Sequence, residues 1–217
     1  MFVIPSMRRV LHRLGFTWKR MRKSLASKRD EDMFRLFAQE KEELTKLSES
    51  KEVDLCYFDG AGFNLNPNVP YAWSPVGTQA ILPAERSRGY TVLGILNVRD
   101  NDFEGDIYEG AANSDAVMKT LGKFAEHLKR KTIVILDNAS IHKSSKVMDK
   151  AVEWRKKGLY LQFIPPYCPE LNLIEILWHR MKHQWLKYEH CATLEQLRDR
   201  IIDILQKYGK DYSINFR

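Results

Sequence analysis

Apolar residues recur along this chain with two different spacings, which predict two kinds of element. Short apolar runs bounded by Gly, Pro, Asn or Asp are typical of strands, and apolar residues three and four positions apart are typical of helices. We expect strands over residues 53–59, 79–82, 90–98, 103–108, 131–137 and 159–164. We expect helices over residues 7–14, 30–48, 114–129, 144–157, 171–187 and 193–207.

The order of these elements predicts an α/β domain. The strands over 90–98 and 103–108 are joined by a short polar segment, so they can form an antiparallel hairpin. Helices and strands then alternate, which is typical of parallel pairing. We therefore expect a mixed sheet with helices packed on it. In the helix over 30–48, the expected apolar stripe consists of Met33, Phe34, Phe37, Leu44 and Leu47.

The composition is that of a globular protein. Of the 217 residues, 44% are hydrophobic and 29% are charged, unlike the composition of disordered chains. The sequence has no apolar run of membrane-spanning length and no signal-peptide core at its start. Three cysteines are too few for a disulfide framework and agree with a reducing compartment. We expect no membrane association and a cytoplasmic location.

Positive charge is concentrated at the N-terminus. Residues 1–29 contain nine Lys or Arg and no Asp or Glu, whereas the whole chain has a formal net charge of only +7. A basic block suits a polyanion such as DNA, and a solvated charged face is the alternative. The candidate DNA-binding residues in this block are Arg8, Arg9, Arg13, Lys19, Arg20, Arg22 and Lys23.

Three acids lie where their carboxylates can converge. Asp59 and Asp137 each end a short apolar run, and Glu175 lies in a Pro-rich segment that opens a predicted helix. Alone, Asp59 and Asp137 can be turn residues, and Glu175 a solvated helix residue. Together, acids at the C-terminal ends of neighbouring strands, faced by a helical acid, can hold two divalent cations for phosphodiester chemistry.

The segments around these acids resemble the signatures of one family. Residues 165–178, PPYCPELNLIEILW, resemble the third-carboxylate signature of mariner-superfamily transposases, most of all that of the bacterial insertion-sequence branch. Residues 134–142, VILDNASIH, resemble the second-Asp signature of that family. Tyr57-Phe58-Asp59, with Gly62-Phe63 and Tyr71-Ala72-Trp73, resembles the first. The three signatures occur in the family's order, over roughly residues 53–187.

This resemblance implies an RNase H-like fold and a catalytic triad of Asp59, Asp137 and Glu175. It also implies cut-and-paste DNA transposition that depends on two metal ions, Mg²⁺ or Mn²⁺. Two positions depart from the family's pattern: Gly60 stands where an acid often follows the first Asp, and Cys168 stands where Ser is usual. Neither belongs to the triad, so we do not expect either departure to inactivate the site.

The resemblance is incomplete at the N-terminus. Family members usually carry a helix-turn-helix region, and residues 7–23 resemble only its end and the linker. We expect residues 1–29 to be a basic remnant of that region and its linker, and residues 30–217 to be the catalytic domain. The chain is then either a truncated copy or the product of the second frame of a split gene. The implied partners are DNA, at element ends and target, with either a second copy of the chain or a separate helix-turn-helix polypeptide. The implied location is the bacterial cytoplasm, at the nucleoid.

Other functions and sites fit some of the same residues. A catalytically inactive remnant would bind DNA and modulate a full-length transposase, and a general nuclease would cut DNA without joining it. The resemblance places His142 near the active site, where it can contact a DNA phosphate or serve in a turn. His179 and His183 are four residues apart, but no paired Cys motif accompanies them, so we set a zinc site aside.

Overall fold

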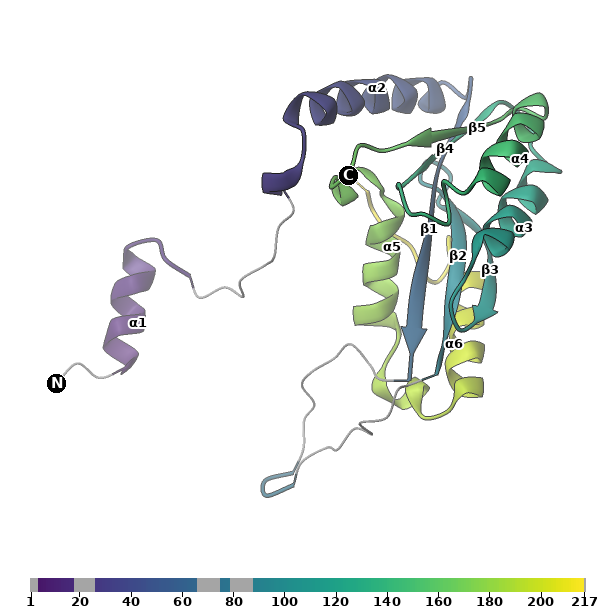
Figure 1. Ribbon diagram of the computed structural model, residues 1–217. Helices are drawn as coiled ribbons and strands as arrows, with labels where there is room; N and C mark the ends of the chain where they lie inside the picture. Colours follow the sequence, from purple (N-terminus) through teal and green to yellow (C-terminus); the bar gives the residue numbers. More distant parts are fainter. Residues whose placement is uncertain (1–3, 18–25, 66–74, 79–87, 217) are drawn as a thin grey trace.

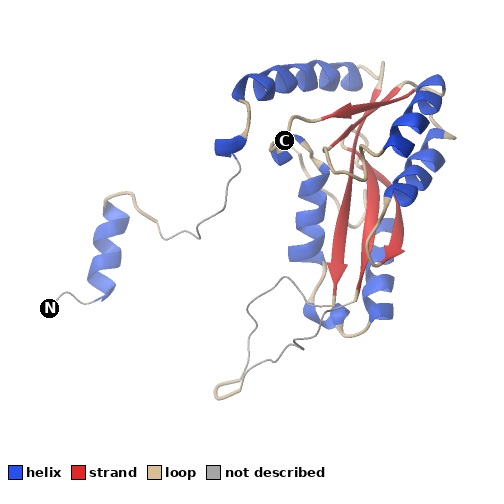
Figure 2. Cartoon of the chain, in the orientation of Figure 1, coloured by secondary structure: helices blue, strands red, loops and turns tan. Residues whose placement is uncertain are grey.

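The computed structural model describes residues 4–17, 26–65, 75–78 and 88–216. Within them, a central sheet carries helices on both faces (Figures 1 and 2). Its strands are β1 (Asp54–Asn64), β2 (Gly89–Asn97), β3 (Asp102–Glu109), β4 (Thr132–Leu136) and β5 (Leu159–Phe163). The α-helices are α1 (Ile4–Arg13), α2 (Glu31–Glu49), α3 (Ser114–Ala125), α4 (Ser145–Lys156), α5 (Ile174–Arg180) and α6 (Leu194–Gln206). No described helix is both long and apolar enough to cross a membrane.

The strands pair in the order β3-β2-β1-β4-β5. β2 is antiparallel to β1 and β3, whereas β1, β4 and β5 run parallel. The predicted mixed sheet and the predicted hairpin between β2 and β3 are therefore confirmed. The strand expected over residues 79–82 lies outside the described residues.

The two sides of β1 face two apolar cores, as the alternation of side chains along a strand requires. Tyr57 and Ala61 pack with α5 and α6, and Cys56 and Phe58 pack with α3 and α4. α2 lies on the first side through Phe37. The stripe predicted for α2 is only partly correct, because Met33 is 49% exposed and Leu47 is 38% exposed.

Two elements differ from their predicted bounds near the acids. β1 continues to Asn64, because β2 pairs with it well past the end of its apolar run. The helix expected over 171–187 is divided into a 3-10 turn (Pro169–Leu171), α5 and a π-helical turn (Met181–Trp185). The first boundary lies at Asn172, whose backbone is extended, and the second lies between Arg180 and Met181.

A glycine lets α5 approach the sheet. Gly94 of β2 is the register partner of Asp59. A Cβ on Gly94 would lie 2.3 Å from the Phe103 ring and 3.0 Å from the Trp178 ring. Trp178 belongs to α5 and is almost fully buried. The missing side chain of Gly94 therefore leaves room for the helix that carries Glu175.

Candidate active site

Asp59 lies on β1 at the point where pairing with β4 ends and pairing with β2 continues. Parallel pairing with β4 stops at Phe58 and Leu136, whereas antiparallel pairing with β2 continues. Asp59 is therefore the first β1 residue beyond the β4 pairing. Its side chain is half-buried and accepts a backbone hydrogen bond from Gly60. The prediction that Asp59 ends its strand is wrong for β1 as a whole, but it holds for the side that faces β4.

Asp137 follows β4 directly, and its carboxylate closes a turn. Oδ1 accepts the backbone N–H of Ala139 at 2.9 Å and the Nδ1–H of His142 at 2.6 Å. The bond from His142 is the main reason that the pKa of Asp137 is lowered, with the bond from Ala139 adding to it against partial burial. Both bonds reach Oδ1, which leaves Oδ2 free to bind a cation.

His142 lies behind Asp137 rather than at the surface. Its side chain is 2% exposed, and its ring meets Phe58 edge-on at a centroid distance of 5.2 Å. Within the described residues, its Nε2 has no hydrogen-bond partner. An enclosed ring cannot reach a DNA phosphate, so this burial argues against the predicted phosphate contact. The contact that His142 makes is instead its hydrogen bond to the Asp137 carboxylate.

Glu175 stands on the first turn of α5, and a buried asparagine anchors the loop before it. Asn172 is 3% exposed and donates its Nδ2–H to the carbonyl of Phe58 at 3.1 Å. Because Phe58 precedes Asp59, this bond ties the loop of the third acid to the strand of the first. Ile174 is fully buried, whereas the side chain of Glu175 is only partly covered by the protein, so the helix directs Glu175 away from the core.

The three acids lie near enough to one another for their charges to interact. Burial raises the pKa of Asp59 to about 7, and the charges of Glu175 and Asp137 add to the rise. Burial also raises the pKa of Glu175; Lys182 opposes this rise, and Asp137 adds to it. Ligand atoms of Asp59, Asp137 and His142 lie within 4.8 Å of one another. Glu175 lies outside that group, yet near enough for its charge to act on Asp59.

Comparison with known families agrees with this geometry. Residues 54–198, which include all three acids, match a family described as DDE superfamily endonuclease. The chain belongs to this family. A relative from Shigella sonnei, the "Insertion element IS630 uncharacterized 39 kDa protein", is 27% identical over 207 residues, which are 90% of this chain. The match covers 56% of that relative, so the DDE chain spans little more than half of its length.

Solved structures of the Mos1 transposase share the fold of this DDE endonuclease chain. A Mos1 mariner paired-end complex with Mn has a TM-score of 0.64 at 15% identity, over 94% of this chain and 64% of that one. A Mos1 paired-end complex with the left transposon end has a TM-score of 0.55 at 15% identity, over 97% and 71%. The expected RNase H-like fold and the resemblance to mariner-superfamily transposases are confirmed.

The candidate active site offers the oxygen ligands that a divalent cation requires. Carboxylate oxygens are the hard ligands that Mg²⁺ and Mn²⁺ prefer, and Oδ2 of Asp137 carries no hydrogen bond from a described residue. The pKa values of Asp59 and Glu175 are raised by burial and in part by the charge of Asp137, and a bound cation would favour the ionised form of both carboxyls. The residues present therefore fit a divalent metal.

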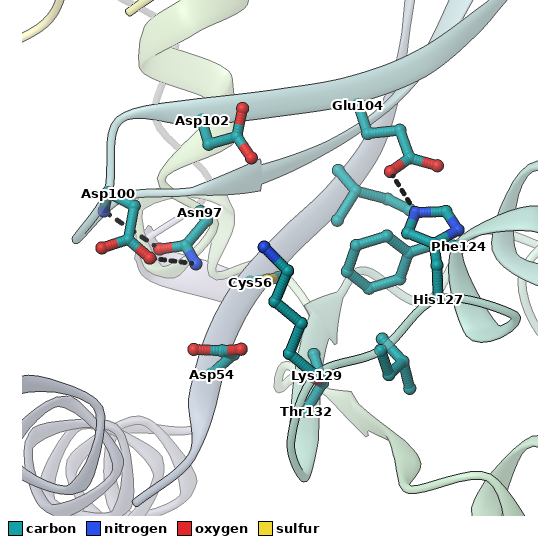
Figure 3. Close-up of a pocket in the computed structure, with 12 residues that line it drawn as sticks. Asp54, Cys56, Asn97, Asp100, Asp102, Glu104, Phe124, His127, Lys129 and Thr132 are labelled. Carbon is teal, nitrogen blue, oxygen red and sulfur yellow. Dashed lines mark hydrogen bonds and ion pairs between the residues drawn. The ribbon is translucent and has the colours of Figure 1, made fainter. Parts of the chain in front are cut away.

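The pocket drawn in Figure 3 lies near the start of β1. We do not assign it to the candidate active site of Asp59, Asp137 and Glu175. Its volume is about 190 Å³, and its lining includes Asp54, Asp100, Asp102 and Glu104. Arg99 pairs with Asp54 at 2.7 Å and with Asp100 at 2.6 Å. Arg99 thus neutralises part of the negative charge in this pocket.

The structure describes some of the remaining predicted site residues. Arg8, Arg9 and Arg13 lie exposed on α1. His179 and His183 stack at a centroid distance of 4.5 Å, but no third ligand-type residue joins them among the described residues. The candidate DNA-binding residues Lys19, Arg20, Arg22 and Lys23 lie outside the described residues.

Proposed function

We propose that this chain is the catalytic part of an insertion-element transposase, which cuts DNA strands and joins the freed 3′-hydroxyl to target DNA. The observation that carries the proposal is the convergence of Asp59 and Asp137, whose ligand atoms lie within 4.8 Å of each other, with Glu175 near enough for its charge to act on Asp59. The triad assignment rests on this convergence, on the family signatures and on the family match.

Each of the three acids has its own role in the proposed site. Two bound Mg²⁺ or Mn²⁺ ions would supply an activated oxygen nucleophile and neutralise charge at the phosphate. Asp137 would hold a cation through Oδ2, since its Oδ1 accepts two hydrogen bonds. Asp59 contributes a half-buried carboxylate from a rigid strand, and Glu175 approaches from α5. Both strand cleavage and strand transfer are then direct displacements without a covalent protein–DNA intermediate.

His142 acts as a positioning residue in this proposal. Its Nδ1–H donates to Oδ1 of Asp137, and this bond fixes the direction in which Oδ2 points. Partners of this kind fix a metal-binding carboxylate, and their loss typically costs about 10–100-fold in metal affinity or activity.

We propose DNA as the partner, at both element ends and target. The Mos1 structure that shares this fold is a complex with a transposon end, and residues 1–29 supply positive charge. A second copy of the chain, or a separate helix-turn-helix polypeptide, would supply sequence recognition. If Arg8, Arg9 and Arg13 each neutralise one phosphate, replacing all three by Ala should make the slope of log K against log salt less negative by about 2.7.

The deciding experiment incubates the purified chain with Mn²⁺ and a supercoiled plasmid that carries the DNA flanking its gene. We expect Mn²⁺-dependent strand cleavage that is lost in Glu175→Gln and retained in Asp149→Asn, a change of an exposed acid on α4. Cleavage that survives in Glu175→Gln would refute the triad. Absence of cleavage in the wild type would support the inactive remnant, and cleavage without joined products would support a general nuclease.

A further inference from the structure

Arg29 joins the segment before α2 to the loop of the third acid. Its Nε and Nη2 donate to the two oxygens of Glu31 at 2.6 and 3.1 Å, and its Nη1 donates to Glu170 at 2.5 Å. The guanidinium lies 4.1 Å from the centroid of the Phe34 ring. With 19% of its side chain exposed, Arg29 is held on three sides, which is unusual for a residue at the start of a surface helix.

The loop that receives Arg29 is short and fixed at several points. Cys168 and Leu171 are buried, and Asn172 is bonded to the Phe58 carbonyl. Tyr167 has a φ of 62°, a conformation that a bulky residue keeps only when its surroundings impose it. Lys28 contributes a further contact, with its Nζ 6.0 Å from the centroid of the Tyr167 ring.

The two anchors act on opposite sides of the loop. Asn172 holds it from the core, and Glu170 is held from the surface by Arg29. Between Glu170 and Glu175 the chain passes through two buried residues and then enters α5. Because the chain between Glu170 and Glu175 has little freedom to move, a displacement of Glu170 would also displace Glu175.

We propose that Arg29 is a positioning residue for Glu175, acting through Glu170. The inference rests on the proposed role of Glu175 as a metal ligand. It also connects the segment before α2 to the active site, because Arg29 belongs to that segment and its side chain contacts the loop of the third acid. An isolated exposed ion pair would contribute little; the bidentate bond to Glu31 and the stacking on Phe34 are what orient Arg29 toward Glu170.

The test is a titration of the full chain with Mn²⁺, followed by calorimetry, for Arg29→Ala and Glu170→Gln. We expect each variant to bind Mn²⁺ about three- to tenfold more weakly than the wild type. This is less than the loss of about 10–100-fold typical of a partner that contacts the metal ligand directly, because Arg29 acts on Glu175 only through Glu170. The double variant should be no weaker than the singles, since both remove one interaction. Arg29→Lys should recover part of the affinity, because a Lys can reach Glu170 without the planar fork.

Controls separate positioning from general stability. Arg35→Ala, a change of an exposed arginine on α2, should leave Mn²⁺ affinity unchanged. A lower unfolding temperature with unchanged Mn²⁺ affinity in both Arg29→Ala and Glu170→Gln would overturn the inference. If Glu175→Gln loses Mn²⁺ affinity while Arg29→Ala and Glu170→Gln do not, only the role of Arg29 fails. If Glu175→Gln binds Mn²⁺ as the wild type does, both the triad and the role of Arg29 fail.

Discussion

Replacing Asp59 by Asn should make the metal-free protein more stable at neutral pH and leave it unchanged in acid. The pKa of Asp59 is raised from 3.8 to about 7 in the folded protein, first by burial and then by Glu175. The folded state therefore holds this proton more tightly than the unfolded state does. Its stabilising contribution is complete below pH 3.8 and is lost as the pH rises to about 7.

The size of the effect follows from the shift. About three pKa units at ~1.36 kcal/mol each set an upper bound of about 4 kcal/mol. Relaxation around the charged carboxylate and water entering the half-buried site reduce this bound, so we expect about 1–3 kcal/mol. Asn keeps the shape of the side chain and still accepts the hydrogen bond from Gly60, but it cannot ionise.

The assay is urea unfolding of wild type and Asp59→Asn in a chelator, across the range from acid to neutral pH. The free energies of unfolding should coincide in acid and separate as the pH rises, with the variant more stable near neutrality. Asp149→Asn serves as the control and should follow the wild type. Added Mg²⁺ should stabilise the wild type and not Asp59→Asn. A difference between the two proteins that does not change with pH would refute the reasoning.

Further predictions concern the other residues of the site. Glu175→Gln should unfold at or above the wild-type temperature without metal, because burial raises the pKa of that carboxyl; Asp137→Asn should unfold below it, because hydrogen bonds from His142 and Ala139 favour the ionised form. Scanning calorimetry in a chelator checks both. His142→Ala should lower single-turnover cleavage about 10–100-fold, and cleavage at the wild-type rate would exclude the positioning role. Asn172→Ala should lower the free energy of unfolding by about 1–3 kcal/mol, as measured in urea, because it leaves a buried carbonyl unpaired.

The fold was predictable because its signals are local. The apolar runs before Asp137 and at β5, and the glycine after α4, are strand and helix signals that tertiary packing reinforced. The end of β1 was not predictable from the same signals. The segment after Asp59 lacks an apolar run, and β2 supplies its pairing from a distant part of the chain.

The sequence predicts the three acids of the proposed site, but not the residues that support them. Signatures around Asp137 and Glu175 mark positions where carboxylates gather. The bond from Asn172 to Phe58 spans 114 residues, and the bond from Arg29 to Glu170 spans 141. Such contacts leave no periodic trace in the sequence. The burial of His142 was likewise outside the sequence signal, because its neighbours in the turn are mostly polar.

The close approach of α5 over Gly94 bears on how surviving and decayed copies of such genes are told apart. A copy that is no longer under selection accumulates substitutions at random positions. An alanine at position 94 would push against Phe103 and Trp178 and move the helix of Glu175, while all three acids remained in the sequence. Counting intact triads would then overestimate the number of working copies in a genome. A glycine opposite Asp59 is a second criterion, and it can be read from sequence alone.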